Sequence, residues 1–217
     1  MVQEIEGVIK YHGHHTHCSS HLTHDDINLI NHWRNLLHSL QLIGQHPSRY
    51  AGYGYGNISQ RHAHHFIISG SQTGHLATLT PQHYCLVTDS DLTANSLNSI
   101  GACKPSSEAL THASVYAQNP NINCVIHAHN PDIWQATHRL KLPFTDKEIA
   151  YGTPEMATAV SQLFSDHAFT SNEIFTMRGH EDGVIAYGTN FSDAFHLLIN
   201  TLINSQLITA VSTNHRA

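Results

Sequence analysis

The heptapeptide Asn123-Cys124-Val125-Ile126-His127-Ala128-His129 carries the strongest pattern in the chain. Its apolar residues predict a buried strand, in which side chains two positions apart point to the same face. His127 and His129 therefore project together, and Cys124, Ile126 and Ala128 face the other way and can enter the core. Two neighbouring imidazoles can bind one divalent ion, at about 2.0–2.1 Å for zinc. Two solvated strand histidines are the alternative, because a chain with 22 histidines contains such pairs by chance.

A helix start lies shortly before this strand, at Pro105-Ser106-Ser107-Glu108, and it predicts a helix over about 107–118. Ser106 and Ser107 would offer hydroxyl and backbone N–H groups there, where the helix dipole favours an anion. Glu108 could move a proton if it lies close to a metal ion. The alternative is an ordinary capped helix N-terminus, in which a glutamate also suits the first turn.

Three glycine-rich segments predict tight turns. The first, Gly52-Tyr53-Gly54-Tyr55-Gly56-Asn57-Ile58-Ser59, has so many glycines that we expect a tight backbone there. The second is Gly70-Ser71-Gln72-Thr73-Gly74, and the third, Gly179-His180-Glu181-Asp182-Gly183, places another histidine in a turn. Taken alone, each is compatible with ordinary turn chemistry.

The remaining pattern predicts a mixed or antiparallel sheet covered by helices, in one α/β domain over residues 1–217. A helix begins near Thr23, which forms a weak capping box with Asp26, and ends at Gly44. Its apolar residues recur at helical spacing: Ile27, Ile30, Trp33, Leu37 and Leu40. The other predicted elements are strands at 5–11, Phe66–Ser69, Tyr84–Thr88, Ile174–Met177 and Val184–Tyr187, and helices at Pro131–Arg139, 154–166 and from about Ser192.

Residues 12–24 hold six histidines together with Cys18, a composition that is typical of metal-binding tracts. The general abundance of histidine favours a solvated polar loop instead. The four cysteines lie far apart and form no CxxC pair, so we expect small buried thiols in a reducing cytosol rather than disulfides.

Composition excludes several partner classes. Charged residues make up 12% of the 217 residues, the net charge is −6, and no basic stripe is present, which argues against nucleic acid or an anionic membrane as partner. The first ten residues lack the apolar region of a secretory signal, and no run of about 18 apolar residues could span a bilayer. We therefore expect a cytoplasmic globular protein.

The order GNIS, PSSE, HAH and a later histidine turn resembles the class II aldolase/adducin family over residues 24–205. That family includes L-fuculose-1-phosphate aldolase, L-ribulose-5-phosphate 4-epimerase and methylthioribulose-1-phosphate dehydratase. The resemblance implies a three-layer fold, a homotetramer, and a sugar or sugar phosphate as substrate.

The resemblance also implies roles for particular residues. The family's metal ligands correspond to His127, His129 and His180, and its general acid/base corresponds to Glu108. The epimerases carry Asp at that position, so an epimerase is disfavoured. The family's phosphate cradle corresponds to Asn57, Thr73, Gly74, Ser106 and Ser107.

Three neutral imidazoles leave the charge of a zinc ion uncompensated and one coordination position open, as in catalytic sites. Such an ion, zinc or another divalent transition metal, could stabilise an enediolate formed from a ketose. The leading hypothesis is a metal-dependent lyase that cleaves a ketose or ketose phosphate by retro-aldol chemistry. A dehydratase of the methylthioribulose-phosphate type is the runner-up. A non-catalytic adducin-like module and a cupin are disfavoured, by the complete histidine set and by the long helical patterns respectively.

The sequence departs from the family in three places. Gly54 stands where the aldolases have a phosphate-contacting Thr, so the anion could be held differently or be absent from the substrate. The aldolases' proton-donor tyrosine has no clear match, and Tyr53, Tyr55 and Tyr151 are candidates. The histidine turn reads HEDG where many relatives have HG, and its two acids are interpreted as part of a solvated turn.

Overall fold

The computed structural model describes residues 7–167, 169–170 and 172–214. Within these residues, nine strands form one sheet in the order β1-β7-β6-β5-β4-β8-β11-β10-β9. The outermost pairs, β1/β7 and β9/β10, are parallel, and all other neighbours are antiparallel. The strands are β1 His12–His17, β4 Asn57–His62, β5 His65–Ser69, β6 Tyr84–Asp91, β7 Ser96–Gly101, β8 Cys124–His129, β9 Phe144–Thr145, β10 Glu173–Met177 and β11 Gly183–Gly188. A separate pair joins β2 Gly44–Gln45 to β3 Gly54–Tyr55.

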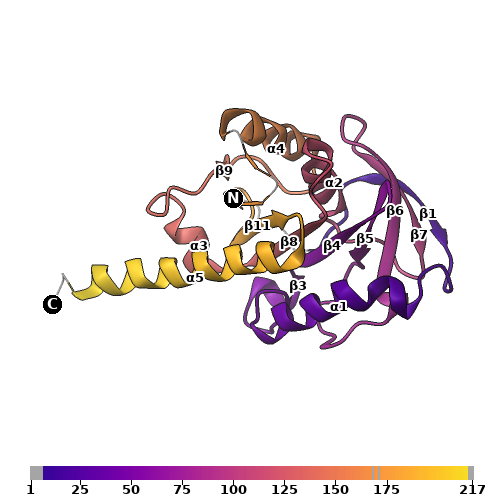
Figure 1. Cartoon of the computed structure of the whole chain (residues 1–217), viewed down its shortest axis with the longest axis horizontal. Coiled ribbons are helices and arrows are strands. Elements are labelled where there is room, and N and C mark those ends of the chain that lie inside the picture. Colours follow the sequence, from indigo (N-terminus) through magenta and orange to yellow (C-terminus); the bar gives the residue numbers. More distant parts are fainter. Residues whose placement is uncertain (1–6, 168, 171, 215–217) are drawn as a thin grey trace.

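Helices cover both faces of the sheet, as predicted (Figure 1). One face packs against α1, α3 and α5, and the other against α2 and α4. The helices are α1 His24–Ser39, α2 Ala109–Gln118, α3 Pro131–Ala136, α4 Pro154–His167 and α5 Phe191–Asn214, with short 3₁₀ turns η1 Tyr50–Gly52 and η2 Pro81–His83. The result is a three-layer mixed α/β fold.

Strand β8 lies between the two hydrophobic cores and contributes to both. Cys124, Ile126 and Ala128 belong to the core beneath α1 and α5, which confirms the predicted alternation. Val125 belongs to the opposite core, beneath α2 and α4. Every residue of β8 is buried. The histidine face of the strand is therefore enclosed by protein as well.

Helix α1 confirms the predicted N-terminus and corrects the predicted end. Thr23 is the N-cap, and its side chain and that of Asp26 bond each other's backbone N–H groups in a complete capping box. The helix stops at Ser39, because Gln41 takes the left-handed conformation (φ 57°) and Leu42 N–H bonds the carbonyl of Leu37. This Schellman-type ending was missed, since glutamine rarely occupies that position. The predicted stop, Gly44, begins β2 instead.

The first strand of the sheet is not the predicted one. Residues 7–11 are not a strand, and 5–6 lie outside the described residues. The histidine-rich segment, predicted to be a loop, forms β1, whose side chains are mostly exposed. Because β1 pairs only with β7 along its length, a polar sequence is tolerated at this edge.

Two longer strands, β4 and β7, and the two-residue strands β2, β3 and β9 were also missed, and other boundaries move slightly. Residues 57–59 were interpreted as part of a tight turn but begin β4, which runs to His62 and pairs with both β5 and β8. Ser96–Gly101 forms β7, although its Ser and Asn residues have low strand propensity. Helix α3 ends at Ala136, before Arg139, and α5 begins at Phe191 with the Asn190 side chain accepting from the Asp193 N–H.

The four cysteines are all free thiols, as predicted. Cys85 and Cys124 are buried, whereas Cys18 and Cys103 are only half-buried. Within the residues described, none of the helices is both long and apolar enough to serve as a bilayer span.

A fully buried polar cluster joins β4 to α2. His112 Nδ1 lies 2.6 Å from the Ser59 hydroxyl, which also lies 2.9 Å from the Tyr116 hydroxyl. Burial lowers the pKa of His112 from 6.5 to about 3, because the surroundings disfavour its charged form. The imidazole therefore stays neutral in the folded protein at neutral pH.

This burial predicts acid-sensitive stability. Between pH 6.5 and about 3 the unfolded chain binds a proton at His112 that the folded chain does not. The free energy of unfolding should thus fall by about 1.4 kcal/mol per pH unit from this group as pH drops below 6.5. The free energy of unfolding, measured by urea titration at several pH values from 6 to 4.5, should fall less steeply with decreasing pH in His112→Gln, by about this amount per pH unit. His14→Gln, which changes an exposed histidine, should keep the original slope; equal slopes in all three proteins would contradict the prediction.

Candidate metal centre and anion cradle

His127 and His129 lie side by side on the buried face of β8. Their ring centroids are 4.8 Å apart, and the side chains are at most 1% exposed. Asn57 lies directly opposite His127 in the β4–β8 register, and its amide Nδ2 lies 3.1 Å from His127 Nδ1. A contact of this kind can orient the ring of a metal-binding histidine.

The turn between β10 and β11 brings His180 to the same place. Its ring lies 5.1 Å from that of His127 and 4.8 Å from that of His129. Each of the three buried histidines offers one ligand atom, and these atoms all lie within 4.8 Å of one another. The structure thus brings together three imidazoles from two distant stretches of the chain.

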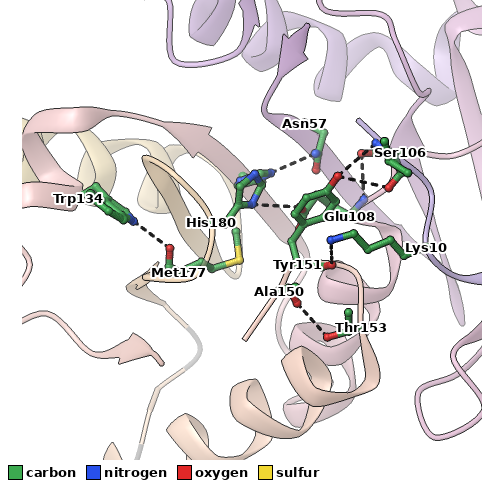
Figure 2. Close-up of polar contacts among 12 residues, drawn as sticks. Lys10, Asn57, Ser106, Glu108, Trp134, Ala150, Tyr151, Thr153, Met177 and His180 are labelled. Atoms are coloured by element: carbon green, nitrogen blue, oxygen red, sulfur yellow. Dashed lines mark hydrogen bonds and ion pairs between the residues drawn. The ribbon is translucent and has the colours of Figure 1, made fainter. Parts of the chain in front are cut away.

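Glu108 adds a carboxylate to this group. It is the N-cap residue of α2, is 1% exposed, and its Oε1 lies 3.2 Å from His180 Nδ1 (Figure 2). The predicted helix start at 107 is therefore two residues early. Burying an uncompensated carboxylate is costly, and Oε2 has no hydrogen-bond partner among the described residues.

This donor set fits a divalent transition metal. Imidazole nitrogens are favoured ligands of zinc, iron, nickel and copper, and three of them leave a further position open. A cation held by His127, His129 and His180 would also compensate the buried charge of Glu108. The arrangement has the composition of a catalytic site rather than of a closed structural site.

A small cavity beside Glu108 collects all five residues predicted for the substrate. Asn57, Thr73, Gly74, Ser106 and Ser107 line it together with Glu108. Its other lining residues were not predicted to bind substrate, although Gly54 was noted as a departure from the family; they are Gly7, Gly54, Gly56, Gly70, Ser71 and Gln72. Most of these lie in the glycine-rich turns, so the turn composition was the available signal. Hydroxyls, amides and backbone dominate this lining, which suits an oxyanion.

Close backbone approach explains two glycines of this cradle. A Cβ on Gly74 would lie 2.3 Å from the Gly44 carbonyl oxygen and 2.9 Å from the Gly54 Cα. Gly56 has φ +69°, and a Cβ there would lie 2.8 Å from the His127 carbonyl oxygen. At Gly54 the nearest atoms would lie 3.4 Å from a Cβ, so a methyl side chain fits there sterically.

The three candidate tyrosines differ in position. Tyr151 is fully buried and stacks on His180, with centroids 4.5 Å apart. Tyr55 is 3% exposed and lies 5.6 Å from the His129 ring, whereas Tyr53 is 44% exposed. Tyr151 and Tyr55 thus contact ligand residues of the candidate metal centre, and no such ring contact is recorded for Tyr53.

An N-terminal segment, residues 7–11, crosses the site next to Tyr151. Val8 N–H donates to the Tyr151 hydroxyl (3.2 Å). Lys10 Nζ lies 3.8 Å from the centre of the Tyr151 ring and donates to the Tyr151 carbonyl (Figure 2). Tyr11 donates to the carbonyl of Pro105 at the other side of the cradle. The segment therefore links the histidine side of the site to the serine side. Sequence reasoning missed it, because these contacts depend on distant partners.

Residues 46–202 match the family model of the Class II Aldolase and Adducin N-terminal domain. The chain belongs to the class II aldolase and adducin family. The match includes every residue predicted for the metal centre and the cradle.

Solved structures share the fold of this family member. An L-fuculose-1-phosphate aldolase from Thermus thermophilus is 18% identical, with a TM-score of 0.64, covering 88% of this chain and 95% of its own. A sugar-phosphate aldolase from Thermotoga maritima is 14% identical, with a TM-score of 0.68 and coverages of 88% and 96%. YgbL from Klebsiella pneumoniae, a putative aldolase/epimerase/decarboxylase, is 17% identical, with a TM-score of 0.64 and coverages of 88% and 91%. These low identities establish the shared fold alone.

The surroundings of Gly74 and Gly54 predict that only Gly54 tolerates substitution by alanine. Gly74→Ala forces backbone atoms apart. It should lower the free energy of unfolding by about 1–3 kcal/mol, and hence Tm by about 3–10 °C in a chain of this size. Gly54→Ala introduces only ordinary contacts and should change Tm by less than about 2 °C. Differential scanning calorimetry of the two variants checks this, and equal losses would contradict the inferred close approach at Gly74.

Proposed function

We propose that this protein is a metal-dependent lyase of the class II aldolase type, which cleaves a ketose or ketose phosphate by a retro-aldol reaction. The observation that carries the proposal is the convergence of His127, His129 and His180 beside the buried carboxylate of Glu108. The sugar-phosphate aldolases with the same fold support this choice of substrate class.

In this proposal the histidine group and Glu108 carry out the reaction, and the neighbouring cradle binds the substrate. The three histidines would hold zinc or a related divalent ion, which when bound supplies a Lewis acid for the carbonyl and hydroxyl oxygens and stabilises the enediolate. Glu108 accepts the proton of the substrate hydroxyl as the carbon–carbon bond breaks to release an aldehyde. The same carboxylic acid then returns the proton to the carbon of the other product, so the protein ends unchanged.

The cradle holds the substrate's anionic end. Ser106 and Ser107, just before α2, and Thr73 offer hydroxyl donors, and α2 begins at Ala109 with its N–H groups nearby. Because the Glu108 carboxylate lines the same cavity, an anion bound there lies beside the residue that moves the proton. Burial of Glu108 excludes water from the proton-transfer step.

The metal is tested by substitution and elemental analysis. The purified protein should hold about one divalent transition metal per chain, and His127→Ala should lose it. His14→Ala changes an exposed histidine that also belongs to an HxH pair, and it should keep the metal. Loss of metal from His14→Ala instead, or no metal in a folded, carefully prepared protein, would contradict the proposed centre.

The reaction is tested with Glu108→Gln, which retains the shape of the side chain but cannot accept a proton. This variant should keep its metal and lose about 10²–10⁴-fold in kcat. The assay is aldehyde release from a panel of ketose 1-phosphates and the unphosphorylated ketoses. Formation of a dehydrated sugar without aldehyde would favour the dehydratase alternative, and full activity of Glu108→Gln would remove Glu108 from the mechanism.

Two further expectations accompany this proposal. The homotetramer implied by the family resemblance is tested by sedimentation, and the cytoplasmic location by fractionation. Activity confined to unphosphorylated sugars would identify Gly54 as the mark of a changed substrate class.

A further inference from the structure

The backbone on the approach to the cradle is strained at Tyr50 and Ala51. Both take the left-handed conformation, with φ of 48° and 55°, and neither is a glycine. A bulky residue in this region is an outlier that costs free energy and persists only where its surroundings hold it. The turn η1 therefore needs a compensating interaction.

The Tyr50 hydroxyl supplies that interaction. It donates to Asp182 Oδ2 at 2.7 Å and accepts from Arg49 Nη2 at 2.8 Å. Arg49 Nη1 also donates to the Tyr55 hydroxyl at 3.1 Å. Hydrogen bonds to charged groups are stronger than those between neutral groups. Asp182 belongs to the HEDG turn, so it is not the freely solvated acid that the sequence suggested.

The same residues surround one of the three histidines. The Tyr50 ring meets the His129 ring edge-on, with centroids 4.7 Å apart, and Tyr55 lies 5.6 Å from it. Arg49 Nη2 donates to the His129 carbonyl at 3.4 Å. Asp182 stands two residues after His180 and is itself left-handed, with φ 60°. One hydrogen-bonded group thus spans from the side of His129 to the turn that carries His180.

We propose that Arg49, Tyr50 and Asp182 form a clasp that holds His129 and His180 in a ligand geometry before any metal binds. The inference rests on the proposed metal centre. These are positioning residues, since they act through the histidines. The strain in η1 is the cost of presenting the Tyr50 ring to His129 while its hydroxyl reaches Asp182.

The clasp predicts weaker metal binding when its central hydrogen bond is removed. Tyr50→Phe keeps the ring against His129 and loses only the hydroxyl, so metal affinity should fall about 10–100-fold. Zinc affinity is measured by chelator competition on the full-length protein, and the visible spectrum of the cobalt(II) form reports ligand geometry. We expect an altered cobalt spectrum as well as the lower affinity.

Companion variants separate the clasp from a purely structural role. Asp182→Ala should weaken metal binding to a similar extent, and the double variant should be little worse than either single one, because both remove the same bond. Asp182→Asn keeps an acceptor oxygen, so it should bind metal more tightly than Asp182→Ala and nearly as tightly as the unaltered protein. Tyr187→Phe is the matched control, since its buried hydroxyl has no hydrogen-bond partner among the described residues, and it should bind metal normally.

The outcomes distinguish this inference from the proposed function. If the unaltered protein binds no metal, the metal centre itself fails. If it binds metal, and Tyr50→Phe has the same affinity and the same cobalt spectrum, the clasp is wrong, whatever the variant's Tm. Should Tyr50→Phe not fold, Asp182→Ala and Asp182→Asn decide the question by the same two measurements.

Discussion

The burial of two histidines in a central strand is the constraint on which the rest of the site depends. Strand β8 has neighbours on both edges and helices on both faces, so the side chains of His127 and His129 are at most 1% exposed. Buried polar groups are tolerated only when partners compensate them. Asn57 and His180, from two other parts of the chain, supply polar neighbours to the pair, and Glu108 in turn lies 3.2 Å from His180.

The candidate anion cradle is built from different chemical groups than the candidate metal centre. Its lining consists of hydroxyls, amides and backbone, with the carboxylate of Glu108 at one end. Recognition of an anion by such donors depends on short-range geometry, which explains why backbone segments approach so closely at Gly74. The N-terminal segment 7–11 contributes Gly7 to this lining, whereas Tyr50 lies beside His129 instead.

Local patterns predicted what depends on nearby residues. The capping box at Thr23 and Asp26 and the alternation along β8 were both confirmed, because each involves contacts within a few positions. The first residues of β4, 57–59, were predicted to lie in a tight turn because glycines precede them, but pairing with β5 and β8 makes them part of a strand. The strand β1 was mistaken for a loop because its histidines oppose burial. A strand at the edge of a sheet can leave most of its side chains exposed, as β1 does.

The sequence by itself determined the motifs, their order, and hence the family, the sheet-and-helix fold and the residues gathered around the site. It could not determine which tyrosine contacts a histidine, that residues 7–11 cross the site, or that Asp182 holds Tyr50. Those features are contacts between residues roughly 95 to 145 positions apart or between separate turns. Local propensity carries no information about them, because only the packing of the complete sheet brings the partners within hydrogen-bonding distance.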